Sequence, residues 1–124
     1  MKIFKVLVAE NDSQVLFALG KVLENEGCVC IPSNSIEQAL TKISLSDPQA
    51  VFLDVSRSVG DYNTIDKIKK INLSIPLVII SSHITDDVKR LAEAVGALQV
   101  IEKPLRLESV RQCLDRIKAK IIEK

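Results

Sequence analysis

The strict alternation of short apolar runs with longer amphipathic stretches restricts the fold of this chain more than any other feature of its sequence. Five apolar runs are predicted to be strands, at residues 3–9, 28–31, 50–55, 76–82 and 98–101. Most of these runs are continuously apolar, which is typical of strands covered on both faces. Alternating strands and helices form a parallel sheet with helices on both sides, because right-handed crossovers leave few other topologies. The sequence therefore predicts an α/β three-layer sandwich with five strands and five helices.

Amphipathic stretches follow the runs, and their apolar residues recur at the spacing of one helix face. The stripes consist of Leu16, Leu19, Gly20 and Leu23, of Ile36, Ala39, Leu40 and Ile43, of Ile65, Ile68 and Ile71, of Val88, Leu91, Ala92 and Val95, and of Leu107, Val110, Leu114, Ile117 and Ile121. Gly27 is expected to end the first helix in the left-handed conformation, and Gly96 to end the fourth. Helix caps are expected at Asp12 or Ser13 and at Asn34 or Ser35.

Length and charge limit the class of protein. The 124 residues are the size of one compact domain, so residues 1–124 are predicted to form a single domain. No apolar run approaches the roughly 20 residues that cross a bilayer, and the N-terminus lacks the apolar core of a secretory signal. We therefore expect a soluble, cytoplasmic protein without membrane contact. The formal net charge of +1 argues against a nucleic-acid partner within this chain, because such a surface needs clustered basic residues.

The cysteines indicate no metal or disulfide framework. Cys28, Cys30 and Cys113 form an odd number without C-x-x-C spacing, which is typical of reduced, partly buried thiols in a cytosolic protein. Cys28 and Cys30 are expected to lie on one face of a strand. His83 is the only histidine, so a zinc site has too few ligands.

Polar residues at the ends of the predicted strands are the candidates for a functional site. They are residues 10–12 (Glu-Asn-Asp) after the first run, Asp54 in the third, residues 81–82 (Ser-Ser) in the fourth and Lys103 after the fifth. Ligands of open α/β sheets bind outside the carboxyl ends of the strands, near the point where the strand order reverses. Carboxylates with a hydroxyl and an ammonium suit Mg²⁺ and a phosphoryl group, because hard oxygens hold the cation while Lys and Ser contact phosphate oxygens.

Four segments resemble the receiver domain of two-component response regulators. The segments are VLVAEND, PQAVFLD, IPLVIISSH and GALQVIEKPL, and in their order and spacing they cover essentially the whole chain. The resemblance implies a flavodoxin-like sheet with strand order 2-1-3-4-5, which places Glu10 and Asp54 on adjacent strands. It also implies a signalling domain and not an enzyme, apart from assistance to its own phosphorylation and dephosphorylation.

The resemblance implies a role for each residue at the strand ends. Asp54 would accept a phosphoryl group from the phosphohistidine of a partner histidine kinase or phosphotransfer protein. Lys103 would pair with Asp54 before the transfer and with the phosphate afterwards, and Ser81 would hydrogen-bond a phosphoryl oxygen. The Lys103–Pro104 bond is expected to be cis. The implied Mg²⁺ ligands are Glu10, Asn11, Asp54 and the backbone carbonyl of Ser56.

Three departures from the family pattern affect these roles. Asn11 stands where the family has a second acid that binds the metal directly, so weaker Mg²⁺ binding is expected. Val100 stands where the family carries a switching Tyr or Phe, so no aromatic ring can swing inward. The loop VSRSVGDY lacks the family's Pro-Gly step, so its metal-binding geometry is expected to differ. Arg57 and Ser56 in this loop are expected to tune access without being essential.

Simpler roles stay open for several of these residues. Asp54 on its own fits an ordinary carboxylate at a strand end, and Ser81 fits a turn hydroxyl. The pair Lys103-Pro104 fits a dipeptide that leads into a helix. His83 fits either a loop residue at the rim of the site or a modulator of phosphoryl transfer and hydrolysis.

Three classes of function follow. The first is a phosphorylatable receiver that switches a surface on the fourth helix, fifth strand and fifth helix, either alone or as the N-terminal part of a longer protein. The second is a pseudo-receiver, a docking or dimerisation module that works without phosphorylation; Asn11 and Val100 favour it, whereas Asp54, Ser81 and Lys103 oppose it. The third, a small flavodoxin-like enzyme or nucleotide binder, needs a glycine-rich loop that ENDSQV lacks. The face from the fourth to the fifth helix is the expected surface of a homodimer.

Overall fold

The computed structural model describes residues 3–56, 62–71 and 74–122. Within these residues, strands and helices alternate along the chain as predicted. The elements are β1 (Phe4–Ala9), α1 (Ser13–Asn25), β2 (Cys28–Ser33), α2 (Ile36–Ser46), β3 (Ala50–Asp54), α3 (Tyr62–Ile71), β4 (Leu77–Ser81), α4 (Asp86–Ala94), β5 (Gln99–Glu102) and α5 (Leu107–Ile122).

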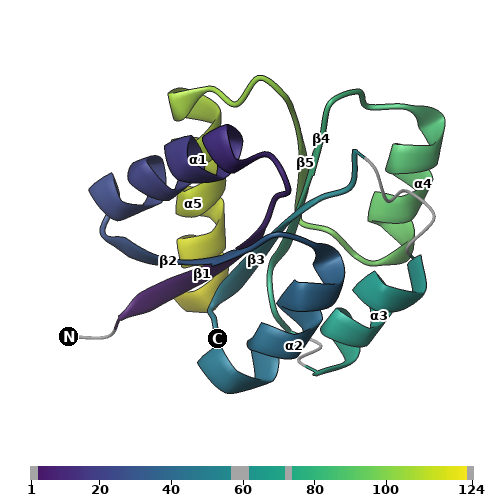
Figure 1. Ribbon diagram of the computed structural model, residues 1–124, viewed down its shortest axis with the longest axis horizontal. Coiled ribbons are helices and arrows are strands. Elements are labelled where there is room, and N and C mark those ends of the chain that lie inside the picture. The colour runs from purple at the N-terminus through teal and green to yellow at the C-terminus, as the bar shows by residue number, and fades with distance from the viewer. Residues whose placement is uncertain (1–2, 57–61, 72–73, 123–124) are drawn as a thin grey trace.

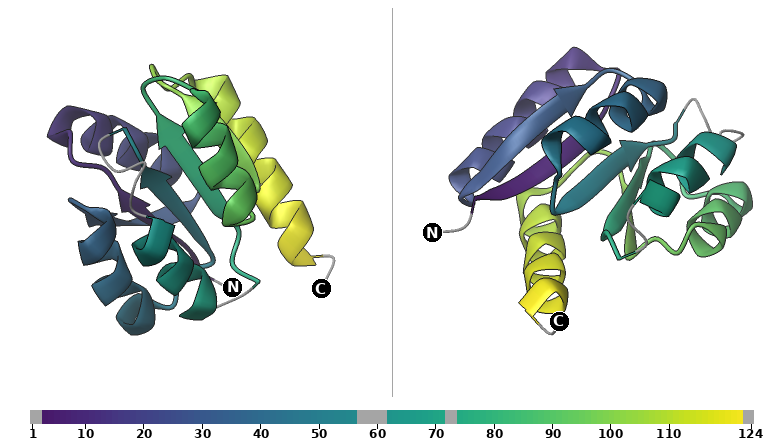
Figure 2. Two further views of the ribbon diagram at one scale, coloured as in Figure 1. Left: turned by 90° about the vertical axis from the view of Figure 1, so that its right-hand side faces the viewer. Right: turned by 90° about the horizontal axis from the view of Figure 1, so that it is seen from below.

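The strands form one parallel sheet in the order β2-β1-β3-β4-β5, which confirms the predicted topology. Helices α1 and α5 cover one face of the sheet, and α2, α3 and α4 cover the other (Figures 1 and 2). The strand order reverses between β1 and β3, and their register pairs Ala9 with Leu53. The residue that follows β1 and the last residue of β3 therefore lie side by side at the carboxyl edge, where the connections diverge and open a crevice.

Two apolar layers hold the sheet between the helices. Leu53 and Ile79 belong to the layer under α2, α3 and α4, whereas Phe52 and Val78 belong to the layer under α1 and α5. Successive residues of one strand thus enter opposite layers, as the pleat of a strand requires. The central strands β3 and β4 are covered on both faces and are apolar up to the polar residue that ends each of them, which is why their sequences do not alternate.

Local signals place the helix ends. Asp12 is the N-cap of α1 and Ser35 the N-cap of α2, each accepting hydrogen bonds from backbone N–H groups of the first turn. Gly27 and Gly96 follow α1 and α4 with φ of 83° and 68°, in the left-handed region that favours glycine. Asp47 follows α2 as its C-cap with a φ of 50°, and it precedes Pro48, whose ring disfavours the helical conformation at the residue before it.

Three details of the sequence-based prediction were wrong. Ile71 and Leu107 were assigned to apolar stripes, yet both are 48% exposed. They are the last residue of α3 and the first residue of α5, so each lies at an end of its helix. Strand β2 continues to Ser33 instead of ending at residue 31, because the carbonyl of Ser33 accepts the Glu10 N–H at 3.0 Å.

Strand β2 is an edge strand, and two residues block its outer side. Ser33 bonds inward to the backbone after β1, so the preceding Pro32 turns its backbone away from the sheet. Proline has no N–H to offer at that position. The Lys42 ammonium donates a hydrogen bond to the Pro32 carbonyl oxygen. At the free edge of β2, Pro32 therefore has no N–H to donate to a further strand, and its carbonyl oxygen already accepts a hydrogen bond from Lys42.

The three thiols are unpaired and shielded. Cys28 and Cys113 are buried, Cys30 is half-buried, and all three pack in the layer under α1 and α5. Burial raises the pKa of Cys28 and raises the pKa values of Cys30 and Cys113 to about 11. A raised pKa keeps a thiol protonated and unreactive near neutral pH.

Across the described ranges, the structure contains no helix that combines the length and the apolar character needed to cross a membrane.

Replacement of two glycines, one in α1 and one after it, by alanine is expected to change the free energy of unfolding in opposite directions. Gly20→Ala is expected to raise the free energy of unfolding by about 0.5–1 kcal/mol, because Gly20 is helical and a Cβ there would lie 3.6 Å from Cys30 Sγ, an ordinary contact. Gly27→Ala is expected to lower it by about 1–2 kcal/mol, because φ is +83°. Urea unfolding midpoints measure both variants, and a shift of the same sign in the two would contradict the assignment.

Candidate functional site

Three charged side chains meet at the carboxyl edge of the sheet. Glu10 follows β1, Asp54 ends β3 and Lys103 follows β5. The Lys103 N–H donates to the Ser81 carbonyl at 2.9 Å, which carries the lysine past the end of β4. The Lys103–Pro104 peptide bond is cis. Parallel topology thus gathers groups that are 44 and 49 positions apart along the chain, from 10 to 54 and from 54 to 103.

Lys103 forms ion pairs with both acids. Its Nζ atom lies 2.9 Å from Asp54 Oδ2 and 2.5 Å from Glu10 Oε1. The side chains of Glu10 and Asp54 are 0% and 6% exposed, so water solvates them little. Two ionised carboxylates against one ammonium would leave a buried negative charge, and an unpaired buried charge is costly. The site therefore favours a further positive charge, either a proton or a cation.

Asp54 is the acid that stays ionised. Burial alone would raise its pKa, but hydrogen bonds from the Glu10 carboxyl, from Ser56 and from Lys103 outweigh burial and lower the pKa to about 2. Ser56 donates twice to Asp54 Oδ1, from its backbone N–H at 2.9 Å and from its hydroxyl at 2.6 Å. Ser56 thus holds Oδ1, and the Lys103 ammonium holds Oδ2. The orientation of the Asp54 carboxylate is fixed by these contacts.

Glu10 is the acid that holds a proton. Burial and the neighbouring Asp54 carboxylate raise its pKa, Lys103 lowers it, and the net result is a pKa of about 7. Glu10 Oε1 is buried and accepts no hydrogen bond of acceptable geometry from the described residues, although Lys103 lies beside it. Below neutral pH the pair of acids therefore carries a proton on Glu10 and a negative charge on Asp54, and Glu10 loses this proton as pH rises through about 7.

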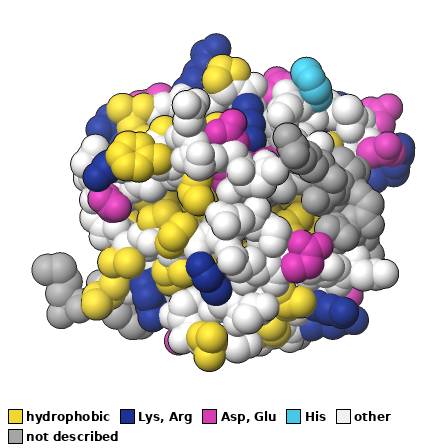
Figure 3. All heavy atoms as spheres, viewed as in Figure 1, with side chains coloured by type: hydrophobic (Ala, Val, Ile, Leu, Met, Phe, Trp, Pro, Cys, Tyr) yellow, Lys and Arg dark blue, Asp and Glu magenta, His cyan; other side chains and the backbone are white. Residues whose placement is uncertain are grey.

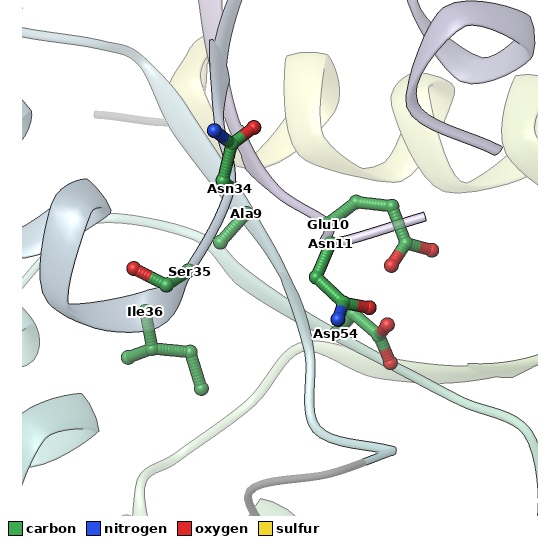
Figure 4. A pocket seen from close by; sticks show the side chains of 7 residues that line it. All are labelled: Ala9, Glu10, Asn11, Asn34, Ser35, Ile36 and Asp54. Atoms are coloured by element: carbon green, nitrogen blue, oxygen red, sulfur yellow. The ribbon is translucent and has the colours of Figure 1, made fainter. Parts of the chain in front are cut away.

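Asn11 directs its side-chain amide toward Asp54 (Figure 4). The two residues line a cavity of about 150 Å³ together with Glu10 and with residues 34–36 after β2. Asp12 does not supply the acid that Asn11 lacks, because its carboxylate accepts hydrogen bonds from the N–H groups of Gln14 and Val15 at the start of α1. The position next to Glu10 is therefore polar but uncharged.

The oxygens at this edge fit a hard divalent cation with one charge fewer than a pair of adjacent acids would give. The Glu10 carboxyl group, the Asp54 carboxylate and the Asn11 amide lie around the same cavity, and the buried Glu10 Oε1 contacts the Lys103 ammonium. Mg²⁺ prefers oxygen ligands of this kind. In the part of the chain that the structure describes, no three His, Cys, Asp or Glu side chains gather at one point, so neutral oxygens would have to complete the coordination.

The two serines at the end of β4 point to different partners. Ser81 is buried, and its hydroxyl donates to the His83 carbonyl at 2.8 Å. Ser82 instead contacts Ser56: its N–H donates to Ser56 Oγ at 2.9 Å, and the two hydroxyl oxygens are 3.0 Å apart. Sequence reasoning assigned a role to Ser81 and gave none to Ser82. The doubled serine was the available signal, but periodicity does not tell which of the two faces the site.

His83 and Val100 lie outside the cluster formed by Glu10, Asp54 and Lys103. The His83 side chain is exposed near the edge of the molecule (Figure 3). Val100 packs against the layer under α2, α3 and α4 and lines a surface hollow with Glu102 and Arg106. Arg57, which was expected to tune access, lies outside the described residues, as does most of its loop.

Comparison with known proteins identifies the family. The strand order and the helices on both faces are those of the flavodoxin-like fold. The chain matches the family model of the response regulator receiver domain over residues 6–115, and it belongs to this family. Receiver domains are signalling domains of two-component systems and not metabolic enzymes.

Regulatory proteins are among the relatives. The chain is 29% identical over 120 residues to the probable C4-dicarboxylate response regulator DctR of Bacillus subtilis, covering 94% of this chain and 53% of that protein. It is 28% identical over 107 residues to the nitrogen assimilation regulatory protein NtrX of Azorhizobium caulinodans, covering 83% of this chain and 23% of that protein. The chain thus spans about half of the first relative and less than a quarter of the second.

Solved structures share the fold. The crystal structure of a CheY-like receiver domain protein from Methanospirillum hungatei superposes with a TM-score of 0.89, covering 99% of this chain and all of that chain at 15% identity. An identity this low shows likeness of fold alone.

Replacement of Glu10 by Gln is expected to stabilise the metal-free protein increasingly as pH rises. The folded pKa of Glu10, about 7, lies above its ordinary value of 4.5, so folded protein binds more protons than unfolded protein between these pH values. Stability of the parent protein therefore falls as pH rises through this window, and Gln removes that loss. The gain should grow by about 1–3 kcal/mol between about pH 5 and pH 8. Urea unfolding in EDTA measures it.

The exposed Glu93 provides the matched control. Glu93→Gln should leave the pH dependence of unfolding unchanged. A pH-independent effect of Glu10→Gln would show that Glu10 is ionised across the window and would contradict the assignment of the proton.

Replacement of Asn11 by Asp is expected to tighten Mg²⁺ binding by about one to three orders of magnitude. A charge at about 4 Å contributes up to about 4 kcal/mol at an effective dielectric constant near 20, and solvation offsets part of this. Magnesium titration monitored by calorimetry or NMR shifts gives both affinities. Equal affinities would show that the amide of Asn11 does not weaken Mg²⁺ binding.

Proposed function

We propose that this domain accepts a phosphoryl group on Asp54 from a partner histidine kinase or phosphotransfer protein and so switches an output surface. The observation that carries the proposal is a buried Asp54 with a pKa of about 2, whose Oδ2 lies 2.9 Å from Lys103 Nζ. A carboxylate that stays ionised is a competent nucleophile. The ammonium beside it is placed to stabilise the charge that a phosphoryl group brings.

The transfer requires one bond to form and one to break. A carboxylate oxygen of Asp54 attacks phosphorus and forms a P–O bond. The P–N bond to the donor imidazole breaks, its electron pair stays on nitrogen, and that nitrogen takes up a proton. Lys103 stabilises the phosphoryl oxygens because its ammonium is already fixed against the acceptor. Mg²⁺, bound by Glu10, Asn11, Asp54 and the Ser56 carbonyl, would supply further positive charge to those oxygens.

Ser81 provides the response to phosphorylation in this proposal. Its hydroxyl donates to the His83 carbonyl within its own loop, so it must turn to reach a phosphoryl oxygen. A charged phosphoryl oxygen is a stronger acceptor than a carbonyl. The turn would pull the loop between β4 and α4 inward and shift the surface of α4, β5 and α5. With Val100 in β5, this shift proceeds without an aromatic ring.

The regulatory proteins related to this chain support a kinase or phosphotransfer protein as partner. We propose the face from α4 to α5 as the surface for a homodimer. No nucleic-acid contact is proposed within this chain, because its net charge is only +1.

A pseudo-receiver that works without phosphorylation is the second candidate. Asn11 leaves the metal position without a second charge, and Lys103 ties up Glu10 as well as Asp54. Val100 removes the aromatic switch. In this case the fold would serve as a docking or dimerisation module, and phosphorylation would not change its binding surface.

Incubation with acetyl phosphate and Mg²⁺ separates the two candidates. A phosphorylatable receiver is expected to gain one phosphoryl group in intact-mass spectra, and Asp54→Asn should abolish the gain because the amide cannot act as the nucleophile. Asp115→Asn, at an exposed acid on α5, is the matched control and should be modified like the parent protein. An adduct that persists in Asp54→Asn, or no adduct at any magnesium concentration, would favour the pseudo-receiver.

A further inference from the structure

Ser56 joins the acceptor carboxylate to the loop between β4 and α4. Its hydroxyl donates to Asp54 Oδ1 at 2.6 Å. The same oxygen accepts the Ser82 N–H at 2.9 Å and lies 3.0 Å from Ser82 Oγ. A serine hydroxyl has one proton and two lone pairs. With its proton on Asp54 and both lone pairs directed to Ser82, the hydroxyl of Ser56 is fully used.

The charge of Asp54 sets the direction of this arrangement. A hydrogen bond to an ionised oxygen is roughly twice as strong as a bond between neutral groups, so the Ser56 proton faces Asp54 as long as Oδ1 is charged. The hydroxyl of Ser82 must then donate to Ser56. Hydrogen bonds in series polarise one another, so weakening of the bond to Asp54 also weakens the bond from the Ser82 N–H.

One other strong tie reaches the start of this loop from another strand, where the Lys103 N–H donates to the Ser81 carbonyl at 2.9 Å, and the remaining ties are local or long. The Ser81 hydroxyl bonds within the loop to the His83 carbonyl. The Ile84 N–H reaches Glu102 Oε2 at 3.3 Å, a long contact that does not involve the acids. In the described part of the chain, Ser56 Oγ is the atom that bonds both Asp54 Oδ1 and the Ser82 N–H, whereas Lys103 reaches the Ser81 carbonyl through its own backbone N–H and not through its ammonium.

We propose that Ser56 is a positioning residue that couples the charge on Asp54 to the backbone of the loop between β4 and α4. While Asp54 Oδ1 is ionised, the hydroxyl holds the Ser82 N–H. When that oxygen loses its charge, the Ser56 proton turns to Ser82 Oγ and the hold on the loop weakens. As the route by which phosphorylation reaches α4, this coupling rests on the proposed function; the coupling itself exists in the unmodified protein.

The test is a double-mutant cycle without any phosphoryl donor. Asp54→Asn removes the charge, and Ser56→Ala removes the hydroxyl. Hydrogen exchange of the Ser82 amide is measured by NMR in EDTA for the parent, both single variants and the double variant. Asp54→Asn is expected to speed exchange about fivefold when Ser56 is present and to have no effect in the Ser56→Ala background, where the bond is already lost.

Two further variants separate coupling from general loosening. Ser56→Thr keeps the hydroxyl and should restore the response to Asp54→Asn. Glu102→Gln weakens the contact to the Ile84 N–H without touching Asp54, so the response of Ser82 should persist. An equal response to Asp54→Asn with Ser or Ala at position 56 would overturn the proposal. The double-mutant cycle needs no phosphoryl adduct. Failure of acetyl phosphate to modify Asp54 would therefore count against the proposed function but would not affect the result of the cycle.

Discussion

The ammonium of Lys103 between Glu10 and Asp54 is the interaction on which the rest of the site depends. The two acids end neighbouring strands, and the reversal of strand order that opens the crevice also forces them together. Without a cation between them, two buried carboxylates would repel each other and resist burial. The lysine comes from the far side of β4, so the ion pairs link three strand ends into one rigid edge.

At that edge, two acids of similar chemistry have different protonation states. The donors of Ser56 and the ammonium reach Asp54, which stays ionised, whereas Glu10 lies deeper and takes up the proton. Such a separation of pKa values by environment is typical of functional sites. Because the amide of Asn11 carries no charge, the charges of the two acids are balanced by Lys103 and by a proton on Glu10.

The fold and the meeting of residues 10, 54 and 103 could be predicted because both follow from strand order. Continuous apolar runs indicated buried parallel strands, and polar residues at their carboxyl ends had to share one edge. The stripe rule failed at Ile71 and Leu107, since periodicity alone does not tell how deeply the residues at the ends of a helix are buried. The contact between Ser56 and Ser82 could not be predicted, because the direction of a hydroxyl in a loop depends on local backbone angles that leave no repeating pattern.

The blocked outer side of β2 limits how copies of this domain can associate. Exposed edge strands are templates for adding a further strand, from an identical molecule or from a growing aggregate. Pro32 offers no donor at this edge, and Lys42 already occupies an acceptor. Extension of the sheet from one molecule into the next is therefore disfavoured at this edge. Copies of this domain that meet through β2 are therefore expected to associate through side chains and not by joining their sheets.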